Sequence, residues 1–163
     1  KHDEVQSLLE SDIPYTHLPA ALGHFLIGDR ESIVVSGTHG KTTTTTMCAF
    51  VAERLGLAPG YLIGGKPVDF PTTFRSPAKN LFIIEGDEYD TAFFAKVPKF
   101  LFYRPKYVML TSVEYDHADI YPDFESVKSA FRGLMKIIPK DGILVACADD
   151  PGVRECLDGP VAF

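Results

Sequence analysis

The chain has 163 residues, of which 45% are hydrophobic, and its net charge is −6 at pH 7. This length suits about one domain, and the acidic balance argues against general affinity for nucleic acid or for an anionic membrane surface. The sequence has no apolar run of about 18 residues and no signal-peptide pattern, so it predicts neither a membrane span nor export. Its three cysteines are widely spaced, which indicates reduced thiols, mostly in the core of a cytoplasmic protein.

The N-terminal segment is predicted to be distinct from the rest of the chain. Glu4–Glu10 has the pattern of a short helix, and Leu18–Ile27 that of a second helical piece. Together they hold too few apolar positions to form a core of their own. We therefore interpret residues 1–30 as a helical tail from a preceding domain or as a linker that lies on the main domain. Residues 31–163 are interpreted as part of one α/β domain.

From residue 31 onward, apolar runs of strand length alternate with helical segments. The predicted strands are Ile33–Ser36, Tyr61–Ile63, Leu81–Ile84, Tyr107–Thr111, Ile143–Ala146 and one that begins at Val161–Phe163. The predicted helices are Thr42–Leu55, Phe124–Ile138 and Pro151–Leu157. Continuously apolar strands separated by helices indicate a mostly parallel sheet with helices on both faces. Since the chain stops where the last strand begins, we expect a truncated domain.

The segment Ser36–Thr43, with the sequence Ser-Gly-Thr-His-Gly-Lys-Thr-Thr, is typical of a phosphate-binding loop. A strand leads into it and a helix leaves it, so backbone N–H groups and a helix N-terminus would face an anion. Thr42–Thr46 are five β-branched residues in a row, which open a helix poorly and therefore favour a functional reason for the sequence. Lys41 would reach the β- and γ-phosphates, and the Thr42 hydroxyl would bind Mg²⁺.

Acidic residues follow two of the predicted strands. Leu81–Ile84 leads into Glu85, and the strand Tyr107–Thr111 is followed by a segment that contains His117. In parallel sheets, ligands bind beyond the carboxyl ends of the strands. Glu85, as the first polar residue after its strand, is the predicted Mg²⁺ ligand beside the triphosphate. His117, with acidic neighbours, is predicted to hold a second divalent ion or to orient a reacting carboxylate. Taken singly, the other acids of these segments are more simply solvated loop residues.

Four separated motifs resemble, in order and spacing, the central ATP-binding domain of the Mur ligases, which are ATP-dependent amide ligases of peptidoglycan synthesis. The motifs are Gly37–Thr43, Glu85–Glu88, Glu114–Tyr121 and Ala148–Asp150. The resemblance extends from residue 31 to about residue 157. Within the family, Glu85–Phe94 and Phe102–Pro105 are most like the murein-recycling branch, which joins UDP-N-acetylmuramate to the tripeptide L-alanyl-γ-D-glutamyl-meso-diaminopimelate. The branch that adds L-alanine is the next most similar.

The resemblance implies ATP and Mg²⁺ as cofactors and a reaction that passes through an acyl phosphate. Thr42 and Glu85 would bind one Mg²⁺, and Glu85 with His117 a second. The expected catalytic residues are Lys41, Glu85 and His117. The adenine-binding residues are expected after Phe163, and the chain alone, as a fragment, is expected to be inactive. The triphosphate would be held by Lys41 and by the backbone amides of Gly37, Thr38, His39, Gly40, Lys41, Thr42 and Thr43.

Other functions stay open at this point. A small-molecule kinase with the same loop would not explain why Glu85–Glu88 is accompanied by Asp116 and His117. A switch GTPase would need an Asn-Lys-x-Asp motif, and the only asparagine, Asn80, is followed by leucine. A nucleotide-binding module without catalysis is a further reading of the fragment. The expected partners are UDP-N-acetylmuramate and peptide substrates, without nucleic acid or membrane, and an unpaired sheet edge would allow self-association.

Overall fold

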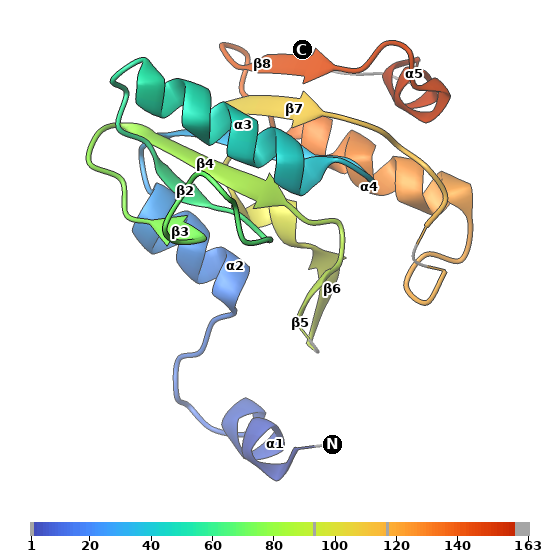
Figure 1. Ribbon diagram of the computed structural model, residues 1–163. Coiled ribbons are helices and arrows are strands. Elements are labelled where there is room, and N and C mark those ends of the chain that lie inside the picture. The colour runs from blue at the N-terminus through green and yellow to red at the C-terminus, as the bar shows by residue number, and fades with distance from the viewer. Residues whose placement is uncertain (1, 93, 117, 159–163) are drawn as a thin grey trace.

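A sheet of six strands forms the centre of the protein in the computed structural model, which describes residues 2–92, 94–116 and 118–158. Its strand order is β3-β2-β4-β1-β7-β8, and every pair is parallel except β2 with β3 (Figure 1). The mostly parallel sheet is thus confirmed, whereas the strand predicted at 161–163 lies outside the described residues. The strands are β1 (Glu31–Ser36), β2 (Gly60–Leu62), β3 (Phe74–Arg75), β4 (Leu81–Gly86), β7 (Tyr107–Leu110) and β8 (Ile143–Ala146).

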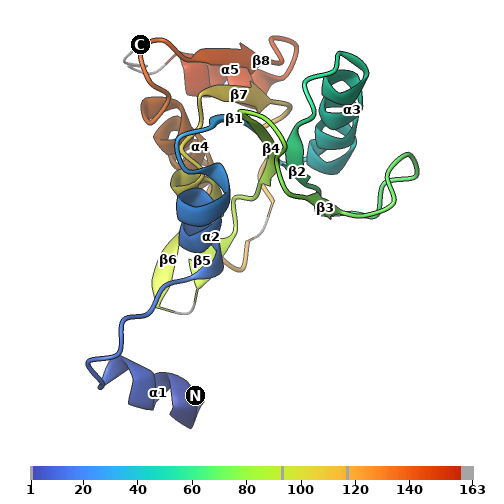
Figure 2. The same cartoon turned by 90° about the vertical axis from the view of Figure 1, so that its left-hand side faces the viewer.

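Helices cover both faces of this sheet, as the sequence predicts (Figures 1 and 2). Helix α3 (Lys41–Arg54) lies on one face, where its Ala49 and Ala52 pack against side chains of β2 and β4. Helix α4 (Phe124–Lys136) packs into the larger core on the other face, and α5 (Pro151–Leu157) lies against α4. The two faces therefore hold two separate apolar clusters.

The helical spacing of the apolar residues in α4 matches the side chains that the structure buries. Val127, Phe131 and Leu134 are buried on one side of the helix, and Ile138 follows in the same cluster. Asp123 caps the helix, because its side chain accepts a hydrogen bond from the backbone N–H of Ser126 at 2.7 Å. Helix α4 is thus held by an amphipathic face and by a conventional N-cap.

Helix α3 opens with threonines that satisfy their hydroxyl groups on the helix itself. The Thr45 hydroxyl donates to the carbonyl of Lys41 at 2.7 Å, and the Thr46 hydroxyl donates to the carbonyl of Thr42 at 2.8 Å. These bonds offset part of the low helix propensity of the β-branched run. The residues that α3 buries are small, which lets the helix lie close to the sheet.

The N-terminal segment packs partly on the main domain. Helix α1 (Asp3–Leu9) buries none of its residues, whereas α2 (Leu18–Ala21) and the π-helical turn η1 (Leu22–Ile27) lie against the sheet domain. Ile27 is fully buried in the larger core, with Leu22 and Leu26 packed around it. The N-terminal segment was predicted to have too few apolar positions for a core of its own. Residues 18–27 instead contribute side chains to the larger core of the main domain.

The structure contains elements that the sequence analysis did not predict. Strands β5 (Asp90–Ala92) and β6 (Ala95–Pro98) form an antiparallel hairpin, followed by the 3₁₀ turn η2 (Lys99–Phe102). The short strand β3 lies in a segment predicted to be a proline-dotted loop. Antiparallel pairings this short leave little hydrophobic pattern to detect.

The structure can be compared with the sequence-based expectations for the three cysteines and for a membrane span. The three cysteines are free, but only Cys156 is buried, while Cys48 is half-buried and Cys147 is exposed, so the prediction that most lie in the core is wrong. Burial raises the pKa of the Cys156 thiol to about 11, which makes it unreactive. Within the described part of the chain, no helix has the length and apolar character that crossing a membrane requires.

Phe131 supports a test of the larger core, since its side chain is fully buried and its ring lies 5.8 Å from that of Phe100. We expect Phe131→Ala to lower the free energy of unfolding by about 3–5 kcal/mol, measured by urea denaturation. Phe25→Ala is the matched control, because Phe25 is 72% exposed and should change stability by no more than about 0.5 kcal/mol. Equal effects of the two substitutions would contradict the assigned core.

Candidate functional site

Charged and hydroxyl side chains from separate parts of the chain meet where β1 and β4 end. Lys41 and Thr42 open helix α3, Glu85 lies in β4 and Glu88 follows that strand. The Thr42 hydroxyl donates to Glu85 Oε1 at 2.9 Å, and Lys41 Nζ lies 2.9 Å from Glu88 Oε2. The structure therefore brings Lys41, Thr42 and Glu85 to one edge of the sheet. His117 lies outside the described residues, so its position relative to them is not part of this geometry.

The two glycines of the loop have backbone conformations that favour glycine. Gly37 has φ of +135° and Gly40, which is the N-cap of α3, has φ of +80°. A Cβ atom on Gly37 would collide with the Thr111 hydroxyl and would lie 2.8 Å from the backbone nitrogen of Ser112. The Gly-x-x-Gly spacing thus reflects backbone geometry and the close approach of the segment after β7.

The segment after β7 supports the glycine loop through hydrogen bonds. The backbone N–H of Thr38 donates to the Ser112 carbonyl at 2.9 Å, and that of His39 donates to the Ser112 hydroxyl at 3.0 Å. These two amides, predicted to hold phosphate, are therefore engaged by the protein itself. The amides of residues 41–43 open α3, where no preceding turn supplies a carbonyl, and they are available to an anion.

The segment after β7 that supports the glycine loop is itself held by helix α5. Asp150 caps α5, since its Oδ1 accepts from the backbone N–H of Val153 at 2.7 Å. The same oxygen accepts from the backbone N–H of Val113 at 3.2 Å, next to Ser112. A Cβ atom on Gly152 would collide with the Val113 carbonyl, so α5 and this segment are in close contact.

Glu85 is positioned by two neighbours, one on each side. Glu85 lies within β4, where it is paired in register with Val35. The prediction that it follows the strand is therefore wrong, because the strand extends to Gly86. Its Oε1 accepts from Thr42, and its Oε2 accepts from the backbone N–H of Gly64 at 2.8 Å. Adjacent carboxylate and hydroxyl oxygens are ligands that suit Mg²⁺.

Few protein ligands for a metal meet at this edge within the part of the chain that the structure describes. Among the described residues, no group of three or more His, Cys, Asp and Glu side chains is arranged to hold a metal ion. Mg²⁺ is typically held by one or two carboxylates together with phosphate oxygens and water, so Glu85 and Thr42 fit it without a larger protein cage.

Glu88 is a component of this edge to which the sequence analysis gave no role. Its side chain is only 2% exposed, and both of its carboxylate oxygens accept from Lys41 Nζ, at 2.9 and 3.2 Å. The Tyr121 hydroxyl donates to the Glu88 carbonyl at 2.6 Å. Burial, and then the nearby carboxylates, raise the pKa of Tyr121, so the phenol stays protonated as the donor. Apart from its place in the Glu85–Glu88 motif, no local sequence pattern predicts that Glu88 is buried against Lys41.

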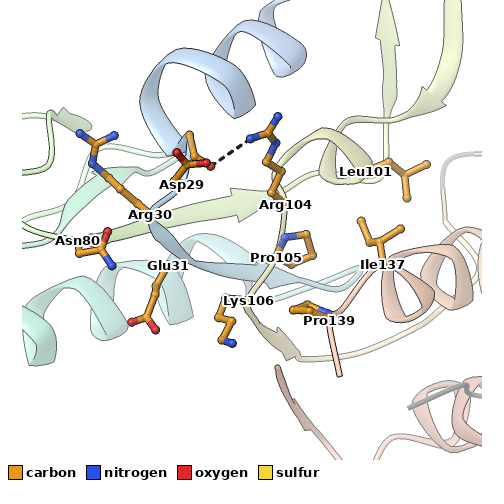
Figure 3. Close-up of a pocket in the computed structure, with 11 residues that line it drawn as sticks. Asp29, Arg30, Glu31, Asn80, Leu101, Arg104, Pro105, Lys106, Ile137 and Pro139 are labelled. Carbon is orange, nitrogen blue, oxygen red and sulfur yellow. Dashed lines mark hydrogen bonds between the residues drawn. The ribbon is translucent and has the colours of Figure 1, made fainter. Parts of the chain in front are cut away.

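The cavity of about 700 Å³ in Figure 3 lies at the opposite edge of the sheet. It borders the starts of β1 and β7, and none of the residues predicted to bind nucleotide or metal is among those that line it. Its basic side chains are used structurally, because Arg104 donates to the Gly28 carbonyl at 3.2 Å and Lys106 pairs with Asp141. This cavity therefore does not compete with the Lys41 edge as the candidate site.

A smaller cavity, of about 280 Å³, adjoins Glu85. It is lined by apolar side chains from α2, η1 and β2 and also by Asp87 and Lys99, which form an ion pair at 2.8 Å. The candidate edge therefore has room for a second ligand beside the Thr42–Glu85 pair.

Residues 35–159 match the Mur ligase middle domain. The chain belongs to this family. Over 153 residues it is 39% identical to the UDP-N-acetylmuramate–L-alanyl-γ-D-glutamyl-meso-2,6-diaminoheptandioate ligase of Escherichia coli, and this region covers 94% of the chain and 34% of that ligase. It is 38% identical over 151 residues to the UDP-N-acetylmuramate–L-alanine ligase of an Arthrobacter strain, covering 93% of the chain and 31% of that enzyme. The chain thus spans about a third of the length of these curated relatives.

A solved structure supports the same assignment. The crystal structure of the UDP-N-acetylmuramate:L-alanyl-γ-D-glutamyl-meso-diaminopimelate ligase from Neisseria meningitides has a TM-score of 0.89 and 39% sequence identity to this chain. The match covers 96% of this chain and 51% of that one. These comparisons confirm the predicted family, its central-domain fold and the resemblance to the tripeptide-adding branch.

The loop geometry generates a test at Gly37. We expect Gly37→Ala to lower the free energy of unfolding by about 2–4 kcal/mol, because a Cβ there is strained and meets Thr111 and Ser112. Gly56→Ala is the control, since Gly56 also has a positive φ, of +72°, but no atom within 4 Å of the added Cβ, and should cost about 1 kcal/mol. Urea denaturation would measure both, and equal losses would show that the close approach at Gly37 has no energetic effect.

Proposed function

We propose that this chain carries the ATP- and Mg²⁺-binding part of an ATP-dependent amide ligase. Its acceptor would be the lactyl carboxylate of UDP-N-acetylmuramate, and its amine substrate the tripeptide L-alanyl-γ-D-glutamyl-meso-diaminopimelate, in cytoplasmic murein recycling. One observation carries the proposal: the 2.9 Å hydrogen bond between Thr42, at the start of α3, and Glu85 in β4, beside Lys41. The identity with the E. coli ligase supports the choice of substrates.

The residues of this edge have separate roles in the proposal. Lys41 and the opening amides of α3 bind the β- and γ-phosphates and place the γ-phosphorus toward the cavity beside Glu85. Thr42 and Glu85 would hold Mg²⁺, and His117 would complete a second metal position. A metal ion held there would offset the charge of the anions that must meet and would stabilise charge in the transition state. Lys41, Glu85 and His117 are therefore the proposed catalytic residues.

The proposed reaction consists of two displacements. A carboxylate oxygen of the acceptor attacks the γ-phosphorus of ATP, the bond to the bridging oxygen breaks, and ADP leaves. The amine then attacks the carbon of the acyl phosphate, phosphate leaves, and the nitrogen loses a proton as the amide forms. The protein's contribution is to hold two anions together at one edge and to keep the γ-phosphate aligned with the cavity beside Glu85.

Lys41 provides a direct test of nucleotide binding by this chain. We expect Lys41→Ala to weaken the binding of Mg·ATP by at least about tenfold, because the β- and γ-phosphates lose their cation. Lys140→Ala removes an exposed lysine that lies near neither the loop nor Glu85 and should change the dissociation constant by less than about twofold. Isothermal titration calorimetry would measure both, and unchanged binding by Lys41→Ala would reject the assignment of the loop.

The reaction itself is tested by product analysis. The 163-residue chain alone should form no amide from ATP, UDP-N-acetylmuramate and tripeptide, since it spans about a third of the length of its relatives. A protein that joins this chain to the remaining length of those relatives should form the tripeptide amide and release one phosphate per amide. Preference for L-alanine would favour the alanine-adding branch. The 38% identity to the Arthrobacter ligase is the reason to test this alternative. A phosphorylated product without an amide would favour a kinase.

Two further expectations from the sequence stay proposals. Residues 1–30 are proposed to connect this domain to a preceding one, with the stretch that includes Ile27 fixed on the sheet. Strand β8 is at one end of the described sheet, with Ile143 and Val145 more than half exposed, so self-association at that edge stays a prediction.

A further inference from the structure

The Lys41 ammonium is fully engaged within the protein. Its Nζ donates to the Gly37 carbonyl at 2.7 Å, to the Thr38 carbonyl at 3.2 Å and to the two carboxylate oxygens of Glu88. An ammonium group has three N–H donors, and the side chain of Lys41 is only 14% exposed. A phosphate oxygen can therefore reach Lys41 only by replacing an acceptor that is already present.

Glu88 is the acceptor that a phosphate oxygen would replace. The carbonyls of Gly37 and Thr38 belong to the same loop as Lys41, whereas Glu88 belongs to the segment after β4. Glu88 is also the anionic acceptor, so it occupies the position on Lys41 that suits a phosphate oxygen. The loop lysine thus faces two competing anions, one built into the protein and one on the nucleotide.

The position of Glu88 is fixed independently of Lys41. Its side chain is 2% exposed, and its backbone carbonyl is held by the Tyr121 hydroxyl at 2.6 Å. The neighbouring carboxylates have different partners: Asp87 pairs with Lys99, and Glu85 accepts from Thr42 and Gly64. Glu88 is therefore the carboxylate of this segment that the fold places on the loop lysine.

We propose that Glu88 is a positioning residue that holds Lys41 in the nucleotide-free loop and gives way to a phosphate oxygen when the triphosphate binds. The ion pair keeps the long lysine side chain over the loop, so nucleotide binding exchanges one anion for another at a preset ammonium. The exchange also carries a cost, because a buried carboxylate loses its ion pair with Lys41 as the triphosphate arrives. The nucleotide part of this inference rests on the proposed function, whereas the role of Glu88 in the free protein does not.

The role in the free protein is tested by labelling lysines without nucleotide. Acetic anhydride reacts with free amines, so an ammonium held by a carboxylate is labelled slowly. We expect Glu88→Gln to raise the acetylation of Lys41 by at least about fivefold relative to the exposed Lys140 in the same molecule, read by mass spectrometry of peptides. Glu53→Gln is the matched control, because it removes the Arg75 ion pair from the far end of the same helix. An unchanged Lys41 to Lys140 ratio in Glu88→Gln would overturn the proposal.

The exchange is tested by the affinity for Mg·ATP. Glu88→Gln removes the competing anion, so we expect its dissociation constant to fall by about tenfold, with Glu53→Gln within about twofold of the parent chain. Glu88→Asp keeps the charge on a shorter side chain and should change labelling and affinity in the same direction by about twofold to threefold. It replaces Glu88→Gln if that variant does not fold. Weaker or unchanged ATP binding by the folded variant would overturn the exchange.

The two measurements separate this inference from the proposed function. If the parent chain and the variants all fail to bind ATP while Lys41 labelling rises in Glu88→Gln, the proposed function fails and the positioning of Lys41 by Glu88 stands. If ATP binds but neither labelling nor affinity responds to Glu88→Gln, the proposed function stands and the role of Glu88 fails.

Discussion

The parallel pairing of β1 with β4 and β7 is the constraint on which the rest of this structure depends. Because these strands run in the same direction, the segments that follow them leave at the same edge of the sheet. The register places Glu85 beside Val35 and Leu110 beside Ser36, so the glycine loop emerges between the carboxylates after β4 and the support after β7. Groups separated by dozens of residues along the chain thus come within hydrogen-bonding distance of one another.

The electrostatic character of that edge supports the proposal that it binds a nucleotide together with a metal ion. Glu85, Asp87 and Glu88 come from one short segment, whereas Lys41 and Lys99 are the cations paired with two of them. An anion such as a triphosphate would meet carboxylates here as well as the start of α3. Divalent cations offset this repulsion, and Glu85 with Thr42 offers them oxygen ligands. In the proposed function, metal and nucleotide therefore bind as a unit.

Much of the fold could be predicted because its signals are local. The apolar strands, the period of α4 and the Gly-x-x-Gly-Lys-Thr loop are each visible in a short window of sequence, and strand alternation with helices implies the parallel sheet. The contact between Thr42 and Glu85 follows from topology, since the loop that precedes Thr42 and the residue Glu85 were both predicted to follow parallel strands. The hairpin of β5 and β6 was not predicted, because its strands are short and lack a clear alternation.

The undetected parts of the candidate site depend on contacts between distant residues. Ser112 holds the amide of His39 across 73 positions, and Glu88 holds Lys41 across 47. No period or spacing reports which polar side chain will be buried against which partner, because that depends on the final packing of the loops. The resemblance to the Mur ligases marked the segment of Glu88, but only the structure shows the contact of this residue with Lys41.

The dual use of Asp150 gives the glycine loop a mechanical link to the far end of the domain. One carboxylate oxygen of Asp150 caps the N-terminus of α5 and also accepts from the backbone N–H beside Ser112. Ser112 in turn accepts hydrogen bonds from the amides of Thr38 and His39. A tilt of α5 would therefore displace Ser112 and, with it, the two loop residues that Ser112 holds. In the proposed function, a movement of α5 would change the affinity for nucleotide without any direct contact between α5 and the nucleotide.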